Sequence, residues 1–191
     1  MPWGNGANFL YVANFKGRTI DVFDKNFAPV TDKPFADPTI PAGFGPFNIQ
    51  ALEGKLYVAY AKLKAPDNED DEAGPGNGYV DVFTPAGILE KRLVTGGALN
   101  SPWGLVRAPA SFGEFNNALL VGNFGDELIH AYDEQGQLLG TLKDQQQQPI
   151  HIDGLWTLVF PTTGLSAEDQ QHLYFTAGPQ GETHGLFGYL K

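Results

Sequence analysis

The stretch LLVGNFGDELIHAYDEQG, residues 119–136, contains the pattern that decides the fold. An apolar run is followed by a turn with Asn and Gly, then by an alternating run that ends in an aromatic residue, and then by a polar turn. Runs of this length, bounded by turn residues, are typical of β-strands that pair as a hairpin. The segment therefore predicts two antiparallel strands.

The same order of residue types recurs along the chain. The copies are LYVANFKGRTIDVFD at 10–24, LYVAYAK at 56–62 continued by GYVDVFTPAG at 78–87, and LYFTAGPQGETHGLFGYL at 173–190. Another apolar segment precedes three copies: PFNIQAL at 46–52, SPWGLVRAP at 101–109 and DGLWTLVF at 153–160. AGILEKRLV at 86–94 and QGQLLGTL at 135–142 supply a fourth strand in two of them. Four-stranded units that recur at roughly 40 to 55 residues are typical of β-propeller blades.

We therefore predict an all-β chain that forms a single propeller-type domain over residues 1–191. Its approximate blades are 1–40, 41–98, 99–148 and 149–191, the terminal blades are incomplete, and an acidic loop is inserted at 63–77. A β-sandwich is the alternative, although sandwich strands do not normally repeat one order of residue types. Large rings are expected to pack between blades; these are Trp103, Trp156, Phe23, Phe83 and Tyr132.

An open array of blades leaves strand edges and apolar faces uncovered. The chain is accordingly expected to be a fragment, or to form a homodimer through its unpaired blade edges. A compact four-bladed ring is a third possibility, which the incomplete terminal units disfavour.

Composition and charge narrow the functional classes. The 191 residues carry a formal net charge of -10, which disfavours a nucleic-acid partner or an anionic membrane surface. Zero cysteines exclude disulfides and thiolate metal sites. No apolar run is long enough to span a bilayer, and the first residues, MPWGNGANFL, lack the pattern of a signal peptide.

Several segments resemble one family. PWGL, LLVGNFGD, IDGLW, LYFTAG and GLFG occur in the order and at the spacing of uncharacterised, mostly bacterial, six-bladed β-propeller proteins related to NHL-repeat proteins. The resemblance extends over nearly the whole chain and is to the C-terminal four blades. It implies a secreted or periplasmic location but no established reaction. The tract DQQQQPIHIDGLW, residues 144–156, departs from the family pattern with four Gln and with His151.

Antiparallel pairing predicts which side chains share one rim of such an array. The turns after the second strands lie beside the openings of the inner strands, and short loops of this kind form the funnel in which propeller ligands bind. The funnel residues expected from this topology are Asn14, Asn48, Asn100, Asn123, Asp126 and Glu182.

The acidic run APDNEDDEAGPGNG, residues 65–78, lies on the same rim. Its oxygen atoms could bind Ca²⁺, with Asp67, Asp70 and Asp71 as the candidate ligands, although the spacing does not match an EF-hand loop. The alternative is a solvated acidic loop.

His184, Asp153 and His151 are the candidate catalytic residues, because they could act as a base or polarise a carbonyl group near the funnel. The serines lie outside any nucleophile-elbow motif. The leading hypothesis is an extracellular or periplasmic binding module for a small molecule or an extracellular polymer. The alternative is a hydrolase or lyase for lactones or esters, assisted by a divalent cation. A protein scaffold is a third class.

Overall fold

The structure is a computed structural model, and it describes residues 8–163, 166 and 168–191. The described residues form four antiparallel sheets. The first consists of β1 (Leu10–Asn14) and β2 (Thr19–Phe23), and the second of β3 (Phe44–Leu52), β4 (Lys55–Lys62), β5 (Gly78–Phe83) and β6 (Leu89–Thr95). The third consists of β7 (Pro102–Arg107), β8 (Leu119–Asn123), β9 (Ile129–Tyr132) and β10 (Leu138–Thr141), and the fourth of β11 (Leu155–Val159), β12 (Leu173–Ala177) and β13 (Leu186–Leu190).

Helical structure in the described residues is limited to short turns. These are the 3₁₀ turns Gly113–Phe115 and Asp169–Gln171 and the single turn α1 (Pro179–Glu182). The expectation of an all-β chain is therefore confirmed. No helix of the described ranges has the length and apolar character that a membrane crossing requires.

The first sheet is smaller than the sequence pattern indicated. The repeat pattern gives this incomplete terminal unit three strands, but beyond Phe23 the chain makes an isolated bridge, between Phe23 and Pro29. Four prolines follow in the segment 29–41. Proline has no N–H to donate to a sheet, so this segment cannot extend the ladder. The beginning of the first expected unit, residues 1–7, lies outside the described residues.

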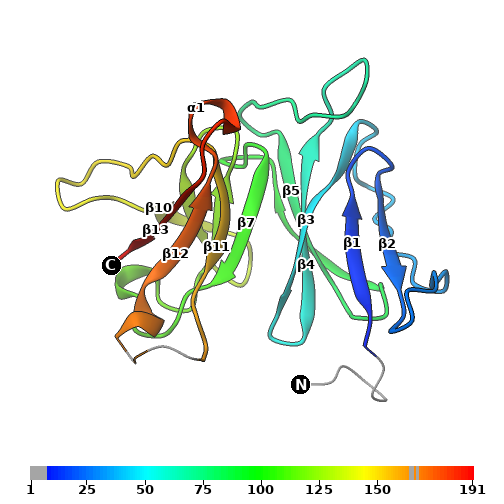
Figure 1. Ribbon diagram of the computed structural model, residues 1–191, viewed down its shortest axis with the longest axis horizontal. Helices are drawn as coiled ribbons and strands as arrows, with labels where there is room; N and C mark the ends of the chain where they lie inside the picture. Colours follow the sequence, from blue (N-terminus) through cyan, green and yellow to red (C-terminus); the bar gives the residue numbers. More distant parts are fainter. Residues whose placement is uncertain (1–7, 164–165, 167) are drawn as a thin grey trace.

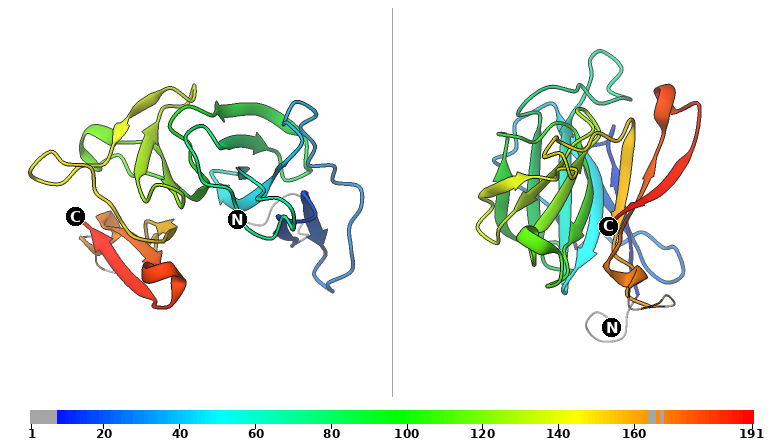
Figure 2. Two further views of the ribbon diagram at one scale, coloured as in Figure 1. Left: turned by 90° about the horizontal axis from the view of Figure 1, so that it is seen from above. Right: turned by 90° about the vertical axis from the view of Figure 1, so that its left-hand side faces the viewer.

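Successive sheets follow one another along an arc, which is seen from above in Figure 2. Each sheet keeps its strands in chain order, and β3, β7 and β11 are the edge strands from which the second, third and fourth sheets begin. These three strands contact one another in sequence, β3 with β7 and β7 with β11. The arc is open, with the first sheet at one end and the last sheet at the other.

The core consists of three apolar clusters, one between each pair of successive sheets in the described chain. Val22 and Phe83 belong to the first, Val80 and Val121 to the second, and Leu155 to the third. Strands of the middle sheets are therefore covered on both faces, and every residue from Leu56 to Ala61 is buried. This explains why these strands are continuously apolar in sequence.

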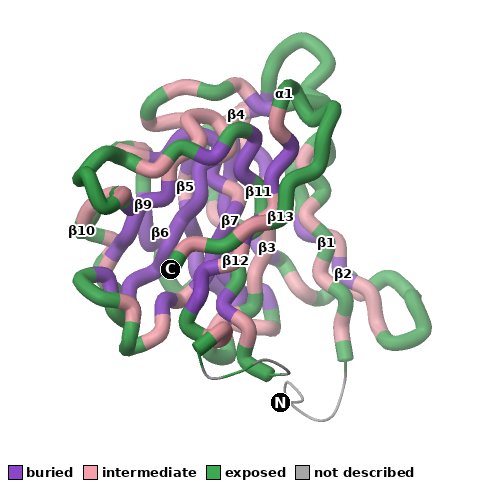
Figure 3. Tube along the Cα trace, turned by 60° about the vertical axis from the view of Figure 1, so that its left-hand side comes forward, coloured by how far each residue is buried: buried purple, intermediate pink, exposed green. Residues whose placement is uncertain are grey.

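The last sheet has no neighbour beyond it among the described residues. Figure 3 shows much of β13 as exposed, whereas β5 and β7 of the middle sheets are largely buried. Phe187 is 69% exposed and Tyr189 is 54% exposed. Burial of large rings is normally favourable, so this strand presents an uncovered apolar surface.

Candidate functional site

β-bulges interrupt β3, β7 and β11 near their first residues, at the end of these strands that is uppermost in Figure 1. The pairing of β3 with β4 skips Phe47, and the pairing of β7 with β8 skips Trp103. The register of β11 against β12 shifts between Leu155 and Leu158, where Trp156 lies. A bulge bends the strand and redirects the side chain of the extra residue. One aromatic residue in each of three consecutive sheets is therefore turned away from regular pairing.

Two of the redirected rings, those of Phe47 and Trp103, meet across the sheets. The ring centroids of Phe47 and Trp103 are 4.7 Å apart with an interplanar angle of 83°. Phe124, in the turn after β8, has its ring centroid 6.4 Å from that of Phe47. Edge-to-face contacts of this kind are favourable between aromatic rings. The side-chain amide of Asn48 adds a link between β3 and β7, because its Nδ2 donates to the Trp103 carbonyl oxygen at 2.8 Å.

Two adjoining cavities open beside these rings, with volumes of about 470 Å³ and 270 Å³. They share Asp70, Asp71, Phe124, Gly181 and Glu182 as lining residues. Phe47, Trp103 and Trp156 complete the wall of the larger cavity, and Glu127 and Asp153 are among the residues that complete the smaller one. We call the two together the rim cavity. Its lining comes from widely separated segments, which is typical of ligand sites.

The tryptophan residues correct one expectation from the sequence. Phe83 and Tyr132 pack between sheets as expected, with exposed fractions of 0% and 2%. Trp156 is 37% exposed, and Trp103 is half-buried. Their bulged positions turn both indoles toward the rim cavity, so neither is a core residue between sheets.

The acidic run separates into paired and unpaired carboxylates. Glu69 forms an ion pair with Lys16 at 2.6 Å and Glu72 with Lys62 at 2.6 Å, and Asp70 lies 3.8 Å from the Lys64 ammonium group. Asp71 is 9% exposed and lines both parts of the rim cavity. Among the ion pairs of the described residues, none includes Asp71.

Burial has a clear electrostatic effect on Asp71. It raises the pKa of this carboxyl group, against the opposing effect of the nearby Ser101 hydroxyl and together with the charge of Asp70. Glu182 has a defined orientation instead, because its Oε1 accepts a hydrogen bond from Trp156 Nε1 at 3.0 Å. Asp153 Oδ2 likewise accepts from the Gln180 backbone N–H at 3.0 Å.

The loop that carries Asp71 is fixed to the neighbouring sheet by Asn100. Asn100 is 6% exposed, and its Oδ1 accepts a hydrogen bond from the Gly74 N–H at 2.6 Å. Gly125 lies against the same amide, because a Cβ at position 125 would be 2.2 Å from Asn100 Oδ1. The absence of a side chain at position 125 thus permits the close approach of these two loops.

The other asparagines expected at the funnel have structural contacts. Asn14 Oδ1 accepts from the Gly17 N–H at 2.9 Å in the turn after β1. Asn123 is fully buried, and its Nδ2 donates to the Ala98 carbonyl oxygen at 2.8 Å. Asp126 Oδ1 accepts from the Leu128 N–H at 3.3 Å. Of the expected funnel residues, Glu182 is thus the one that lines the rim cavity.

The candidate catalytic residues are not brought together as a set. Asp153 lines the rim cavity, whereas His151 and His184 are exposed and are not among its lining residues. The His184 Nδ1 lies 3.0 Å from the Thr183 hydroxyl. Across the described chain, no hydrogen bond or ion pair joins any two of these three side chains.

The candidate metal ligands differ in their surroundings. Asp67 and Asp70 are exposed, and Asp71 is buried. Within the described ranges, no group of three or more His, Asp or Glu side chains is arranged so that it could hold a metal ion.

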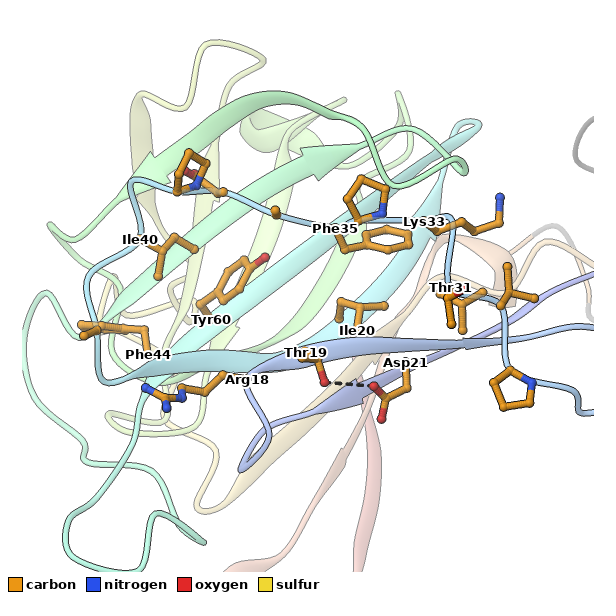
Figure 4. A pocket seen from close by; sticks show the side chains of 18 of the residues that line it. Arg18, Thr19, Ile20, Asp21, Thr31, Lys33, Phe35, Ile40, Phe44 and Tyr60 are labelled. Carbon is orange, nitrogen blue, oxygen red and sulfur yellow. Dashed lines mark hydrogen bonds between the residues drawn. The ribbon is translucent and has the colours of Figure 1, made fainter.

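A second cavity, of about 780 Å³, lies beside the first sheet (Figure 4). Apart from Tyr60, its lining residues all come from the segment 18–44. Arg18 and Lys33 bring positive charge to it, and Asp21 is hydrogen-bonded to Thr19. Because this cavity is formed largely by one segment and its own loop, it lacks the convergence of separate elements that marks the rim cavity.

Sequence reasoning did not identify Phe47 and Phe124 as site residues. A signal was present for Phe47, because PFN, PWG and LWT place an aromatic residue at the same point of three repeated segments. The bulges themselves depend on how neighbouring strands pair, which the local pattern does not specify.

No protein-family model matches the chain. Two uncharacterized proteins of Acanthamoeba polyphaga mimivirus are similar to it. One is 38% identical over 187 residues, which are 96% of this chain and 49% of that protein. The other is 35% identical over 188 residues, which are 96% of this chain and 46% of that protein. The chain thus spans about half the length of the curated relatives it matches.

One solved structure has a similar fold. It is a protein of unknown function from Bacteroides caccae, which is 12% identical and aligns with a TM-score of 0.52. The alignment covers 98% of this chain and 58% of that protein. At this identity the similarity concerns the fold alone.

Proposed function

We propose that this chain is a binding module that recognises a small molecule, or part of an extracellular polymer, in the rim cavity. The observation that carries the proposal is the set of three bulges, which turn Phe47, Trp103 and Trp156 toward one cavity. A bulge interrupts the sheet hydrogen bonds, and bulges occur preferentially beside functional sites. Three of them at equivalent positions are more than core packing requires.

The shape and the lining of the cavity support a ligand site. A volume of about 470 Å³ for the larger part lies in the ordinary range for small-molecule pockets. Its partly exposed aromatic walls and its carboxylates combine apolar contact with fixed polar groups.

The proposal includes the arrangement of the four sheets as consecutive blades of a propeller-type array. Support comes from the repeated order of residue types in the sequence and from the chain order of strands in each sheet. In that arrangement β3, β7 and β11 are the innermost strands, and the rim cavity lies at their entrance, where propeller loops gather.

A lactone or ester hydrolase has less support than a binding module. Its candidate bases, His151 and His184, are not among the lining residues of the rim cavity. A divalent cation would require several oxygen ligands around one point. The candidate ligand Asp67 is not among the lining residues of the rim cavity, and Asp70 lies 3.8 Å from the Lys64 ammonium group.

The test is thermal unfolding of the purified protein with a panel of sugars, amines, lactones and short oligosaccharides. A ligand of the folded state stabilises it by about 2.7 kcal/mol at a hundredfold excess over its Kd. We expect at least one compound to raise the Tm of the wild type, and Trp103→Leu and Trp156→Leu to abolish the rise. Phe187→Leu, an exposed ring on β13, is the matched control. A panel without effect, or a rise unaffected by both tryptophan variants, would contradict the proposal.

A further inference from the structure

The rim cavity carries negative charge without a neutralising basic side chain in its lining. Its acidic residues are Asp70, Asp71, Glu127, Asp153 and Glu182, and neither part of the cavity is lined by Lys, Arg or His. Other acids of the same loop are paired with lysines, as Glu69 is with Lys16 and Glu72 is with Lys62. Asp70 lies 3.8 Å from the Lys64 ammonium group, so Asp71 is the cavity acid of this loop that takes part in no ion pair of the described residues.

Asp71 is the most buried of the acidic residues that line the rim cavity. It is 9% exposed, lines both parts of the cavity, and takes no part in the ion pairs of the described chain. A carboxylate withdrawn from water is costly unless a positive charge or hydrogen bonds compensate it. A cation would neutralise this charge, whereas a neutral ligand such as a sugar could compensate it only through hydrogen bonds from its hydroxyl groups.

The aromatic wall of the rim cavity favours organic cations over metal ions. Phe47, Trp103, Phe124 and Trp156 present aromatic rings to the larger cavity. Aromatic rings attract alkylated ammonium groups through their negative faces, and tryptophan is the strongest of them. A hydrated metal ion gains no ligands from such rings, since calcium and magnesium bind oxygen atoms. Glu182 and Trp156 belong to both features, because the carboxylate accepts the indole N–H and holds the ring beside the acids.

We propose that the rim cavity binds a small organic cation that carries an alkylated ammonium group, with the ammonium between the aromatic rings and the carboxylates of Asp71 and Glu182. This inference rests on the proposed binding function and specifies its ligand class. The ring faces replace water around the alkyl groups, and the acids supply the opposite charge.

The experiment uses choline as the probe, and 3,3-dimethyl-1-butanol as its neutral isostere, in calorimetric titrations of the whole chain. Glucose and calcium chloride are titrated in parallel. We expect choline to bind and the neutral isostere to bind at least roughly tenfold more weakly, because the isostere keeps the shape and loses the charge. Raising the salt concentration should weaken the choline affinity, since screening reduces the attraction to exposed acids.

Two variants test whether the buried Asp71, rather than the exposed Asp67 of the same loop, contributes to choline binding. Asp71→Asn should weaken choline binding roughly tenfold, whereas Asp67→Asn, in the same loop but outside the cavity lining, should leave it unchanged. Circular dichroism and the Tm of each variant establish that it is folded. If Asp71→Asn fails to fold, Trp103→Leu, with Phe187→Leu as its control, provides the same comparison on the aromatic wall.

The outcomes distinguish the two proposals. Equal affinity for choline and its neutral isostere, or binding of glucose or calcium without choline, would overturn the ligand class and leave a binding site in place. An absence of binding by every probe, together with an unresponsive thermal panel, would overturn the binding function as well.

Discussion

The pairing of Asp81, Arg92 and Asp37 makes a quantitative prediction about the response of stability to pH. Asp81 lies in β5 with a side chain that is fully buried, and its Oδ1 is 3.3 Å from Arg92 Nε. The same guanidinium group also pairs with Asp37. Two carboxylates thus share one positive charge, and Asp81 Oδ2 has no hydrogen-bond partner in the described structure.

This arrangement favours a protonated Asp81. Burial, reinforced by the charge of Asp37 and opposed by Arg92, raises the pKa of Asp81 to about 7. In the unfolded chain the pKa of an aspartic acid is about 3.9. The folded state therefore holds the proton more tightly, and the stability that this provides is fully present below about pH 4 and lost as the pH rises through about 7.

The perturbation is Asp81→Asn, which replaces the carboxyl group by a neutral amide of similar size. The pKa of this carboxyl group is about 3.9 in the unfolded chain and about 7 in the folded protein. The free energy of unfolding of the wild type should therefore fall by about 2.5 kcal/mol between pH 5 and pH 8. The variant lacks this loss. Its stability relative to the wild type should therefore rise by about 2.5 kcal/mol over the same interval, whatever the substitution costs in packing.

The assay is urea unfolding of both proteins at pH 5 and pH 8. Asp37→Asn is the control, because the two acids share Arg92 but differ in the direction of their pKa shifts. Although burial acts to raise it, hydrogen bonds from Thr39 and Arg92 hold the pKa of Asp37 below its ordinary value. Asp37 is thus ionised at both pH values, but its charge helps to raise the pKa of Asp81, so Asp37→Asn should reduce the loss of stability between pH 5 and pH 8 without removing it. Parallel curves for the wild type and Asp81→Asn would refute the reasoning.

The remaining predictions concern the rim cavity and β13. Gly154 has a φ of +66°, and a Cβ there would lie 2.3 Å from the Gly178 carbonyl oxygen, so Gly154→Ala should lower the free energy of unfolding by about 1–3 kcal/mol in urea titrations. Asn100→Ala leaves the half-buried Gly74 N–H without its acceptor and should cost about 1 kcal/mol in the same assay. Because burial raises the pKa of Asp71, choline affinity measured by calorimetry should begin to fall at a higher pH than the ordinary aspartate pKa of about 3.9 would give, with a smaller fall in Asp71→Asn. The exposed ring of Phe187 should promote self-association, so that sedimentation velocity shows a concentration-dependent increase that Phe187→Ser reduces.

Much of the strand layout could be predicted because it follows from local patterns. The segments 56–62 and 78–87 were expected to contain paired strands, and β4 and β5 lie there. Alternation and turn residues determine such hairpins within a few residues. The third strand that the repeat pattern gives the first unit is absent, because the prolines of the segment after Phe23 lack donors for the ladder.

The sequence predicted where the candidate site lies better than it predicted which residues line it. Pairing direction placed Asp153, Glu182 and the acidic loop at one rim, and these residues do line one cavity. The histidines His151 and His184 share that end of the molecule but are not among the lining residues. Strand direction specifies an end of the sheet, whereas the orientation of a loop side chain depends on contacts with other loops.

The sequence by itself determined the β-strands, the repeated order of residue types and the position of the acidic loop, because period-two patterning and turn chemistry act over short distances. Tertiary structure alone decided which aromatic residues leave the core and which acid is buried. Phe47, Trp103 and Trp156 face the cavity because bulges shift the pairing with neighbouring strands. Asp71 is buried while Asp67 is exposed because Asn100, in the loop before β7, holds the acidic loop in place. Both outcomes arise from contacts between segments far apart in the chain.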